Sequence, residues 1–541
     1  MPATVRQPFG CLADAVTALC TGAVSSRELV ETAFADAELL DPLLGVYVRR
    51  FPEGALAAAT AADTLHPADR GPLHGLPLAV KDNIAAYEGP VTAQSPAHDP
   101  GWWRGTDAPV VARLRAAGAV LLGKTTMAEY AMGRPDPAHT FPLPRNPWDP
   151  DRWTGGSSTG NGAGIASGLF LGALGSDTSG SVRLPAALCG TTGLKPTYGL
   201  LPIDGCVPLS PSQDVIGPMA VGARDCALLL AALTGRPAAP PRGAAGVRGL
   251  RIGVPYGLLA HPGLSADVRT AFAEALRTLE QLGAHIREFG LPEFEGLLAV
   301  NAVTMLGEAF TAHAGRLAAR WSTHGRAFRR LAAVGATLPA PLRHGARDRG
   351  RVLTAALRER MGGPDGVDLL AMPTWPAAAR PYHQEAAPGD ELNLTAVWNP
   401  TGFPALALPM GADADGLPLS LQLVGHPHAE HTLLAAGEAY QAVTDWQLRR
   451  ATPDPRLVPR PLPDPDRAAA TPPESGAPAA TPDGTPADTA AIEAIEATLA
   501  SVGIRPDPAD LAAIAALSRV LLSPGLSPGP APGLAPGDAA A

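Results

Sequence analysis

The segment GGSSTGNGAGIASGLFLGALGSDTSGSVR, from Gly155 to Arg183, is a long tract of glycine and serine. It contains two serine clusters, Ser157-Ser158 and residues 179–181, each embedded in glycines. Glycine lets the backbone come close to a reacting carbonyl and aim its amides at a developing oxyanion. Serine is a weak nucleophile until a base activates it. The tract therefore predicts an acyl-transfer site, provided that a base lies elsewhere in the chain.

Lys81 is the candidate base, because it follows the apolar run LPLAV, which has the pattern of a short buried strand. A lysine accepts a proton only where desolvation or nearby positive charge keeps it neutral. Taken alone, a lysine after an apolar strand is usually a surface residue with a buried stem, and serines among glycines usually form loops. The combination of Lys81 with two serine clusters instead favours an acyl-transfer site without histidine.

Composition bounds the class of protein. The 541 residues are 46% hydrophobic and 17% charged, with a formal net charge of −9, so most of the chain can bury a core. No run of Lys or Arg predicts direct nucleic-acid binding or an anionic membrane surface. The longest apolar stretch, residues 165–174, is far shorter than the roughly 20 residues of a membrane span. Five scattered cysteines argue against a disulfide or zinc framework. Without a signal-peptide pattern, we expect a cytoplasmic protein.

Strand-like and helical patterns alternate along most of the chain. The apolar strand-like runs are residues 76–80, 119–122, 251–254, 369–372, 405–410 and 419–424. The helical patterns are a capping box at Ser25 and Glu28 with its following helix, residues 107–117, 266–282 and 431–443, and a mainly helical stretch at 291–360. Such alternation predicts an α/β fold with a mostly parallel or mixed sheet.

The composition changes near residue 452, where a Pro/Ala/Thr-rich stretch begins. We predict a main domain over residues 1–455, a linker over 456–487, a helical tail over 488–522 and a disordered end over 523–541. The tail carries two apolar helical stripes. It could be a marginal appendage, or its stripes could dock on the main domain, since isolated helices of this length are barely stable in water.

Six segments together resemble the amidase signature family. They are residues 75–84 around Lys81, 107–133, 146–168, 173–199, 208–220 and, more weakly, 401–425. Their order and spacing extend over roughly residues 10 to 445, which makes the resemblance specific. It implies a mixed central sheet covered by helices on both faces. Thr159-Gly160-Asn161 after GGSS, and Ser179 in the second cluster, depart from the usual family pattern.

The resemblance implies a Ser–cis-Ser–Lys triad. Ser181 matches the nucleophile, Ser157 matches the serine preceded by a cis peptide bond, and Lys81 matches the general base. Neutral Lys81 would take a proton from Ser157, which takes one from Ser181, and Ser181 would then attack the amide carbonyl. No metal or cofactor is implied.

Further residues receive supporting roles from the same resemblance. The backbone amides of Thr178, Ser179, Gly180 and Ser181 match the oxyanion hole. Ser158 is expected to form a hydrogen bond near Lys81. Asp177 and Arg183 are expected to hold the loop. We interpret Lys124 and Lys195, the other lysines in family-like segments, as structural.

Two other motifs offer competing sites. Residues 156–160 fit G-x-S-x-G, which would make Ser158 the nucleophile of an α/β-hydrolase, but RNPWDPDRWT before it is a poor strand. His426, His428 and His431 could indicate a metal-dependent amidohydrolase. They lie late in the chain without matching ligands upstream, so a solvated loop is the simpler interpretation.

The sequence thus predicts an amidase that acts on a small-molecule amide. The alternatives are the glutamine-hydrolysing amidase component of a tRNA-dependent amidotransferase and an inactive amidase fold that only binds. The helical tail faintly resembles the small helical protein that wraps such amidases. Family members are often dimers, so the resemblance allows a homodimer and gives no membrane partner. We expect residues 127–145, 204–214 and 391–403 to line the substrate pocket, with Trp398 and Phe403 in its wall.

Overall fold

A computed structural model describes residues 9–138, 140–236, 246–382, 384, 392–460 and 486–522. Its centre is a mixed sheet of 11 strands in the order β1-β3-β2-β4-β6-β5-β10-β11-β9-β7-β8. The strands are β1 (Tyr47–Arg50), β2 (Pro77–Lys81), β3 (Val120–Thr125), β4 (Gly172–Asp177), β5 (Thr192–Lys195), β6 (Val215–Ala220), β7 (Arg251–Val254), β8 (His285–Glu288), β9 (Leu369–Pro373), β10 (Ala405–Ala412) and β11 (Pro418–Gly425). Parallel pairs (β2 with β3 and β4, β7 with β8 and β9) join antiparallel ones, so the predicted mixed α/β sheet is confirmed.

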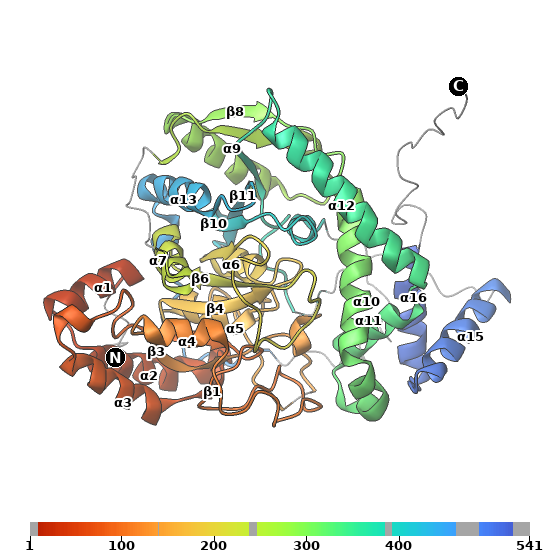
Figure 1. The fold of residues 1–541 in the computed structure, drawn as a ribbon, viewed down its shortest axis with the longest axis horizontal. Coiled ribbons are helices and arrows are strands. Elements are labelled where there is room, and N and C mark those ends of the chain that lie inside the picture. The colour runs from red at the N-terminus through yellow and green to blue at the C-terminus, as the bar shows by residue number, and fades with distance from the viewer. Residues whose placement is uncertain are drawn as a thin grey trace, which may run out of the picture.

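Helices cover both faces of this sheet (Figure 1). Those of the main body are α1 (Leu12–Thr21), α2 (Ser26–Leu44), α3 (Pro52–Thr64), α4 (Pro109–Ala116), α5 (Thr159–Ser167), α6 (Arg183–Cys189), α7 (Ala223–Thr234), α8 (Tyr256–Leu259), α9 (Ala266–Gln281), α10 (Phe294–Arg320), α11 (Arg326–Thr337), α12 (Ala340–Gly362) and α13 (Glu430–Thr444). The register of the β5–β10 pair shows which residues face which layer of helices, because side chains alternate between the two faces along a strand. Gly193 of β5 faces α6, whereas Leu406 and Leu408 of β10 face α13.

Local signals in the sequence explain where several elements begin. Ser25 caps α2, and its side chain accepts the N–H of Glu28 while the Glu28 carboxylate accepts the N–H of Ser25, which confirms the predicted capping box. The predicted strands at 251–254 and 369–372 correspond to β7 and β9. The pattern missed the β4 strand and helix α5, both inside the Gly/Ser tract, and helix α6, which begins at the last residue of the tract. Glycine and serine hide the apolar periodicity there, although every residue of α5 is buried.

The helical tail lies against α11 (Figure 1). It consists of α15 (Pro486–Ser501) and α16 (Pro508–Leu522). Leu499, Ile504 and Ile514 are fully buried and belong to the same hydrophobic cluster as the main sheet. The tail therefore docks rather than hanging free, as one of the two interpretations expected. Most of the predicted linker and the predicted disordered end lie outside the described residues.

Among the described helices, none combines the length and the apolar character needed to cross a membrane. Trp398 and Phe403, expected in the wall of the substrate pocket, are fully buried in the hydrophobic core instead. Both residues lie shortly before β10, and the indole N–H of Trp398 donates to the Leu394 carbonyl at 3.1 Å. Trp398 and Phe403 therefore contribute to the hydrophobic core rather than to the wall of a pocket.

Candidate active site

Lys81 is the last residue of β2, a strand that is buried along its whole length. The β2 strand lies between β3 and β4 inside the sheet, and the Lys81 side chain is 0% exposed. Its Nζ lies 2.7 Å from Ser157 Oγ, 2.9 Å from Ser176 Oγ and 3.2 Å from the Ser176 carbonyl. Burial lowers the pKa of Lys81 to about 7. A substantial fraction of this amine is therefore neutral near pH 7 and can accept a proton from a hydroxyl.

Ser157 lies two residues before α5, and the Gly156–Ser157 peptide bond is cis, as the resemblance implied. Its carbonyl accepts the N–H of Ala128 at 3.1 Å. The N–H of Ser158 donates to the Ser181 carbonyl at 3.1 Å, which ties the first serine cluster to the second. The Ser158 hydroxyl donates to the Ser176 carbonyl at 3.3 Å. Since Lys81 also binds that carbonyl, Ser158 forms its hydrogen bond beside Lys81.

Ser181 lies in the turn between β4 and α6, and it keeps 9% of its surface exposed. Asp177 and Arg183 flank this turn and form a fully buried ion pair at 2.9 Å. Asp177 also accepts the N–H groups of Gly180 at 2.9 Å and Val182 at 3.1 Å. Burial acts to raise the pKa of Asp177, but the charge and hydrogen bonds of Arg183 outweigh it and hold that pKa well below its usual range. A carboxylate that is ionised at neutral pH thus shapes the turn that carries Ser181.

Gly180 is required in this turn for two reasons. Its φ is +121°, a region that favours glycine. A Cβ added there would lie 2.1 Å from Thr395 Oγ1, whose hydroxyl donates to the Ser179 carbonyl at 2.8 Å. The Gly180 amide is already engaged by Asp177. Of the four amides that the resemblance matches to an oxyanion hole, that of Gly180 is therefore occupied within the turn.

Several residues that support the site carried no signal in the sequence. Ser176 binds Lys81 and also accepts the Asn83 amide at 2.9 Å. Asn301 of α10 accepts the Ser179 hydroxyl at 2.9 Å and donates to the Thr178 carbonyl at 3.1 Å. The guanidinium of Arg183 donates at 2.8 Å to three further acceptors, in Thr395, Gln422 and Asn399. Ser176 lies on β4, which pairs with β2 beside Lys81, but the Gly/Ser tract hid that strand from the sequence pattern.

The other two lysines have different partners. Lys124 is buried beside Asp82 at 3.7 Å, and it donates to the Ile84 carbonyl at 2.8 Å. Lys195 donates to the Pro196 carbonyl at 3.1 Å. Burial, followed by repulsion from Arg183, lowers the pKa of Lys195 to about 7 as well. A lowered pKa therefore does not single out the base; the short contact to a serine hydroxyl distinguishes Lys81.

The competing motifs lack the surroundings that their chemistry needs. A G-x-S-x-G nucleophile requires a strand just before Ser158, and the described residues between β3 and α5 contain none. The His426 ring binds the Val367 carbonyl at 3.0 Å, and the N–H of His428 donates to Thr197. Within the described ranges, no three or more His, Cys, Asp or Glu side chains gather where a metal ion could bind.

Comparisons with known proteins agree on one family. The family model described as Amidase matches residues 28–434. A component of the glutamyl-tRNA(Gln) amidotransferase of Roseiflexus sp. (strain RS-1) is 37% identical over 475 residues, covering 81% of this chain and 97% of the relative. The putative amidase AmiD of Mycobacterium bovis is 35% identical over 466 residues, covering 81% and 95%.

The solved structures point the same way. The peptide amidase PAM, in complex with the competitive inhibitor chymostatin, superposes with a TM-score of 0.70 at 29% identity, over 82% of this chain and 98% of PAM. The 11-stranded mixed sheet with its covering helices is thus the fold of amidases. The chain belongs to the amidase family, which its lysine and serine motifs predicted, and it is an enzyme that acts on amide C–N bonds.

Proposed function

We propose that this protein is an amidase that hydrolyses a carboxylic amide through Lys81, Ser157 and Ser181. The observation that carries the proposal is the 2.7 Å contact between Lys81 Nζ and Ser157 Oγ, at a lysine whose pKa is lowered to about 7 by burial. A neutral amine beside a hydroxyl is the arrangement that a proton relay needs. The 3.1 Å hydrogen bond from Ser158 N–H to the Ser181 carbonyl supports the last link, because it holds the two serine segments together.

The reaction starts when Lys81 Nζ takes the proton of Ser157 Oγ while Ser157 takes that of Ser181 Oγ. Ser181 Oγ then bonds to the amide carbon, and the negative charge moves to the carbonyl oxygen. In this proposal the amides of Thr178, Ser179 and Ser181 receive the oxyanion, and each such donor is typically worth about 3 kcal/mol in the transition state. The relay returns a proton to the nitrogen as the C–N bond breaks. Water then repeats the sequence on the acyl-enzyme and releases the acid.

The direct test is covalent labelling with a fluorophosphonate, which phosphonylates an activated serine and expels fluoride. Peptide mapping of the labelled protein should place the adduct on Ser181. Ser181→Ala should remove it, whereas Ser167→Ala should not, because the buried Ser167 hydroxyl binds carbonyls of its own helix α5, that of Ala163 at 2.8 Å and that of Gly164 at 3.2 Å. An adduct on Ser158, or none on the folded wild-type protein, would refute the relay. The latter outcome would instead favour an inactive, binding-only amidase fold.

A second function has support from the comparisons, since a relative at 37% identity is named as part of a glutamyl-tRNA(Gln) amidotransferase. In that case the physiological amide would be glutamine, and the ammonia would pass to a partner protein. A panel of aliphatic, aryl and ureido amides that includes glutamine separates the two. Turnover of several panel amides by the chain alone supports a stand-alone amidase. Glutamine hydrolysis that requires a partner protein supports the amidotransferase.

We also propose that residues 1–455 form the amidase domain and 488–522 a tail that stabilises it. The buried Leu499 and Ile514 support this division. The same site residues would serve a monomer or a homodimer, and analytical ultracentrifugation of the full chain would distinguish these states.

A further inference from the structure

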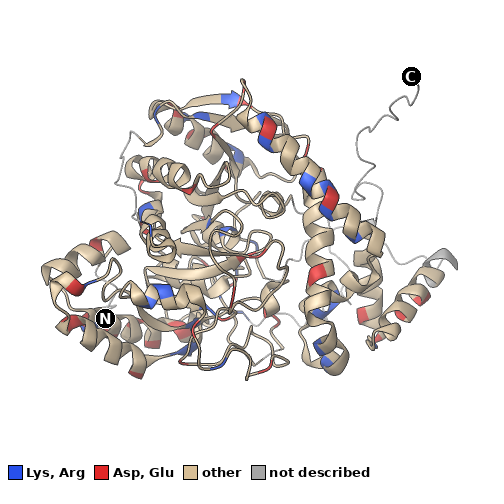
Figure 2. Cartoon of the chain, viewed as in Figure 1, with Lys and Arg blue, Asp and Glu red and all other residues tan. Residues whose placement is uncertain are grey.

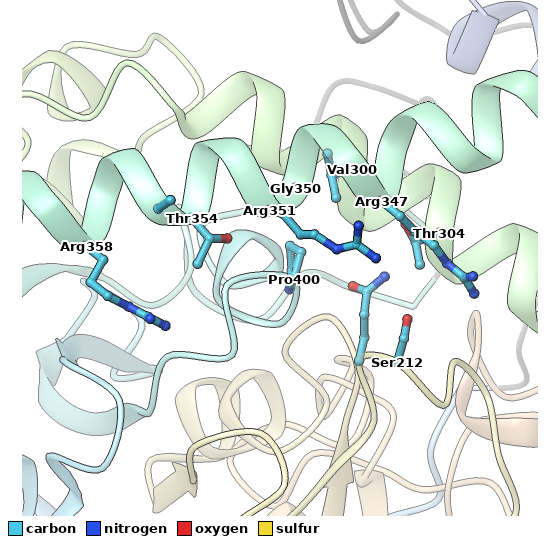
Figure 3. Close-up of a pocket in the computed structure, with 11 residues that line it drawn as sticks. Ser212, Val300, Thr304, Arg347, Gly350, Arg351, Thr354, Arg358 and Pro400 are labelled. Atoms are coloured by element: carbon cyan, nitrogen blue, oxygen red, sulfur yellow. The ribbon is translucent and has the colours of Figure 1, made fainter. Parts of the chain in front are cut away.

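A groove of about 570 Å³ lies between α12 and the loop that precedes β6. Lys81, Ser157 and Ser181 do not line it. Ser212, Gln213 and Pro400 do, and they belong to segments that the sequence assigned to the substrate pocket. Its wall on α12 includes Arg347, Arg351 and Arg358, and Figure 3 shows Arg347 and Arg351 reaching from that helix toward the loop that carries Ser212. Positions i, i+4 and i+11 lie on one side of a helix, so the three guanidinium groups share the groove.

The arginines are only partly neutralised. Arg347 pairs with Glu308 at 2.6 Å, and Arg351 pairs with Asp348 at 2.9 Å. Figure 2 shows acidic and basic residues interspersed along α12. Arg358 lies over the Phe403 ring at 6.0 Å, and no carboxylate of the described chain forms an ion pair with it. The groove therefore retains positive charge beyond what its own acids balance.

Three buried polar atoms in the same groove have no hydrogen-bond partner. They are the amide nitrogen of Gln213 and the hydroxyls of Thr304 and Thr354. Gln213 is 1% exposed and Thr304 is 6% exposed. Buried donors are costly when unpaired, and most are satisfied in native proteins. An amide donor, two hydroxyls and guanidinium groups around one space form a donor set suited to a carboxylate.

Gln213 also connects the groove to the catalytic turn. Its side-chain oxygen accepts the Asn301 amide, and that same amide donates to the Thr178 carbonyl at 3.1 Å. The oxygen of Asn301 in turn accepts the Ser179 hydroxyl at 2.9 Å. A ligand that pulls on Gln213 therefore acts two hydrogen bonds away from the backbone that presents Ser181.

We propose that this groove binds a small organic anion through a carboxylate, at a site that the catalytic residues do not line, and that occupancy alters the turn that carries Ser181. Arg351 and Arg358 supply the charge, while Gln213 and Thr304 donate from the floor. The binding part of this proposal is independent of the proposed amidase relay. The effect on the turn rests on Ser181 being the reactive serine.

Isothermal titration with malonate tests the binding. Wild-type protein should bind malonate saturably, and more tightly than inorganic phosphate, at constant ionic strength set with chloride. Arg358→Gln should weaken malonate binding about tenfold, as expected for one lost charge-assisted hydrogen bond. Gln213→Glu keeps the oxygen that Asn301 binds but places a negative charge in the groove, so it should abolish binding. The control Arg277→Gln removes an exposed arginine that pairs with Glu274 at 2.6 Å elsewhere, and it should bind like wild type.

Labelling of Ser181 tests the coupling. Saturating malonate should change the rate of fluorophosphonate labelling in wild type but not in Arg358→Gln, whose basal rate should equal that of wild type. No saturable malonate binding, or binding unaffected by Arg358→Gln, would overturn the site. Arginine-dependent binding with an unchanged labelling rate would overturn the coupling alone. Failure of Ser181 to label at all would count against the amidase relay and leave the titration result intact.

Discussion

Two fully buried carboxylates of this protein pair with arginine, and they stabilise two different regions, the catalytic turn and the docked tail. Asp177 pairs with Arg183 at 2.9 Å within one turn of the main domain. Asp510 of α16 pairs with Arg330 at 2.6 Å and Arg329 at 2.7 Å, across 180 residues or more. The first pair shapes the turn that carries the candidate nucleophile. The second attaches the tail to α11.

The difference lies in how each pair reaches the catalytic residues. Asp177 binds the amides of Gly180 and Val182 directly. On the tail side, Arg329 donates to the His324 carbonyl at 3.1 Å and the His324 ring lies 3.1 Å from Glu129. Glu129 follows Ala128, whose N–H donates to the Ser157 carbonyl at 3.1 Å. We therefore expect changes around Asp177 to affect chemistry and stability together. Changes around Asp510 should affect mainly the docking of the tail.

The largest effect on the catalytic side should come from Lys81→Met, which keeps the length of the buried stem and removes the amine. Loss of a relay member of this kind typically lowers kcat by about 10⁴-fold or more. The wild-type pH profile checks the same residue. Because the amine must be neutral, kcat/KM should rise with pH and level off above about 7, the pKa of Lys81. Below that value it should fall about tenfold per pH unit.

The control for this prediction is Lys195→Met, because the pKa of Lys195 is also lowered to about 7 by burial but its amine binds a carbonyl. It should keep the acid limb of the profile in place even if it lowers stability. If Lys195→Met shifted the acid limb of the kcat/KM profile while a conservative variant of Lys81 left it in place, Lys195 rather than Lys81 would be the base.

Asp177→Asn should have the next largest effect, because it leaves the guanidinium of Arg183 buried without its counter-charge. Breaking one side of a buried ion pair typically costs about 3–5 kcal/mol of unfolding free energy, measurable by urea denaturation. Since the pKa of Asp177 is depressed, its contribution is present at neutral pH and is lost as pH falls below about 4. The deficit of the variant should therefore shrink in acid.

Asp368→Asn is the matched control. Asp368 pairs with Arg251 at 2.9 Å, but both side chains are about one-third exposed. Solvent screening reduces the value of such pairs to about 0–1 kcal/mol. An equal loss of stability in both variants would show that burial does not distinguish the pair at the catalytic turn.

The same contrast explains what the sequence could predict. Asp177 and Arg183 lie six residues apart in one motif, so their association with Ser181 followed from the resemblance. The partners of Asp510, Arg329 and Arg330, lie on α11 about 180 residues earlier in the chain. No local sequence pattern identifies these arginines as partners of Asp510. Asn301 was missed for the same reason, since its contact with Ser179 depends on how α10 packs. Sequence pattern reveals local geometry, whereas long-range side-chain pairing depends on tertiary packing.

Asp510→Asn should loosen the tail while leaving the chemistry nearly intact. It weakens two charge-assisted hydrogen bonds and retains an acceptor for the Trp321 indole, which lies at 3.1 Å. We expect a loss of about 1–3 kcal/mol in docking. Hydrogen–deuterium exchange of residues 508–522 should accelerate, with kcat changed less than in Asp177→Asn.

Asp507→Asn provides the comparison on the same helix, because Asp507 is 55% exposed, lies 3.8 Å from Arg329 and caps the Asp510 N–H, a role that asparagine also fills. Its exchange should resemble that of wild type. If Asp510→Asn lowered kcat as strongly as Asp177→Asn, the tail would have to be counted as part of the catalytic machinery, acting through Arg329, His324 and Glu129.

The smallest effect should come from Ser518→Ala, which removes a single neutral hydrogen bond between α16 and α11. Ser518 Oγ lies 3.1 Å from Thr337 Oγ1, and the Thr337 hydroxyl also has the Val334 carbonyl at 2.8 Å. Because Thr337 keeps that partner, the loss should be at the low end of about 0.5–1.5 kcal/mol. Exchange of residues 508–522 should rise slightly, and Ser501→Ala, which removes only a local bond to Thr498, should leave it unchanged. A loss as large as that of Asp510→Asn would mean that packing around Ser518, rather than the buried carboxylate, holds the tail.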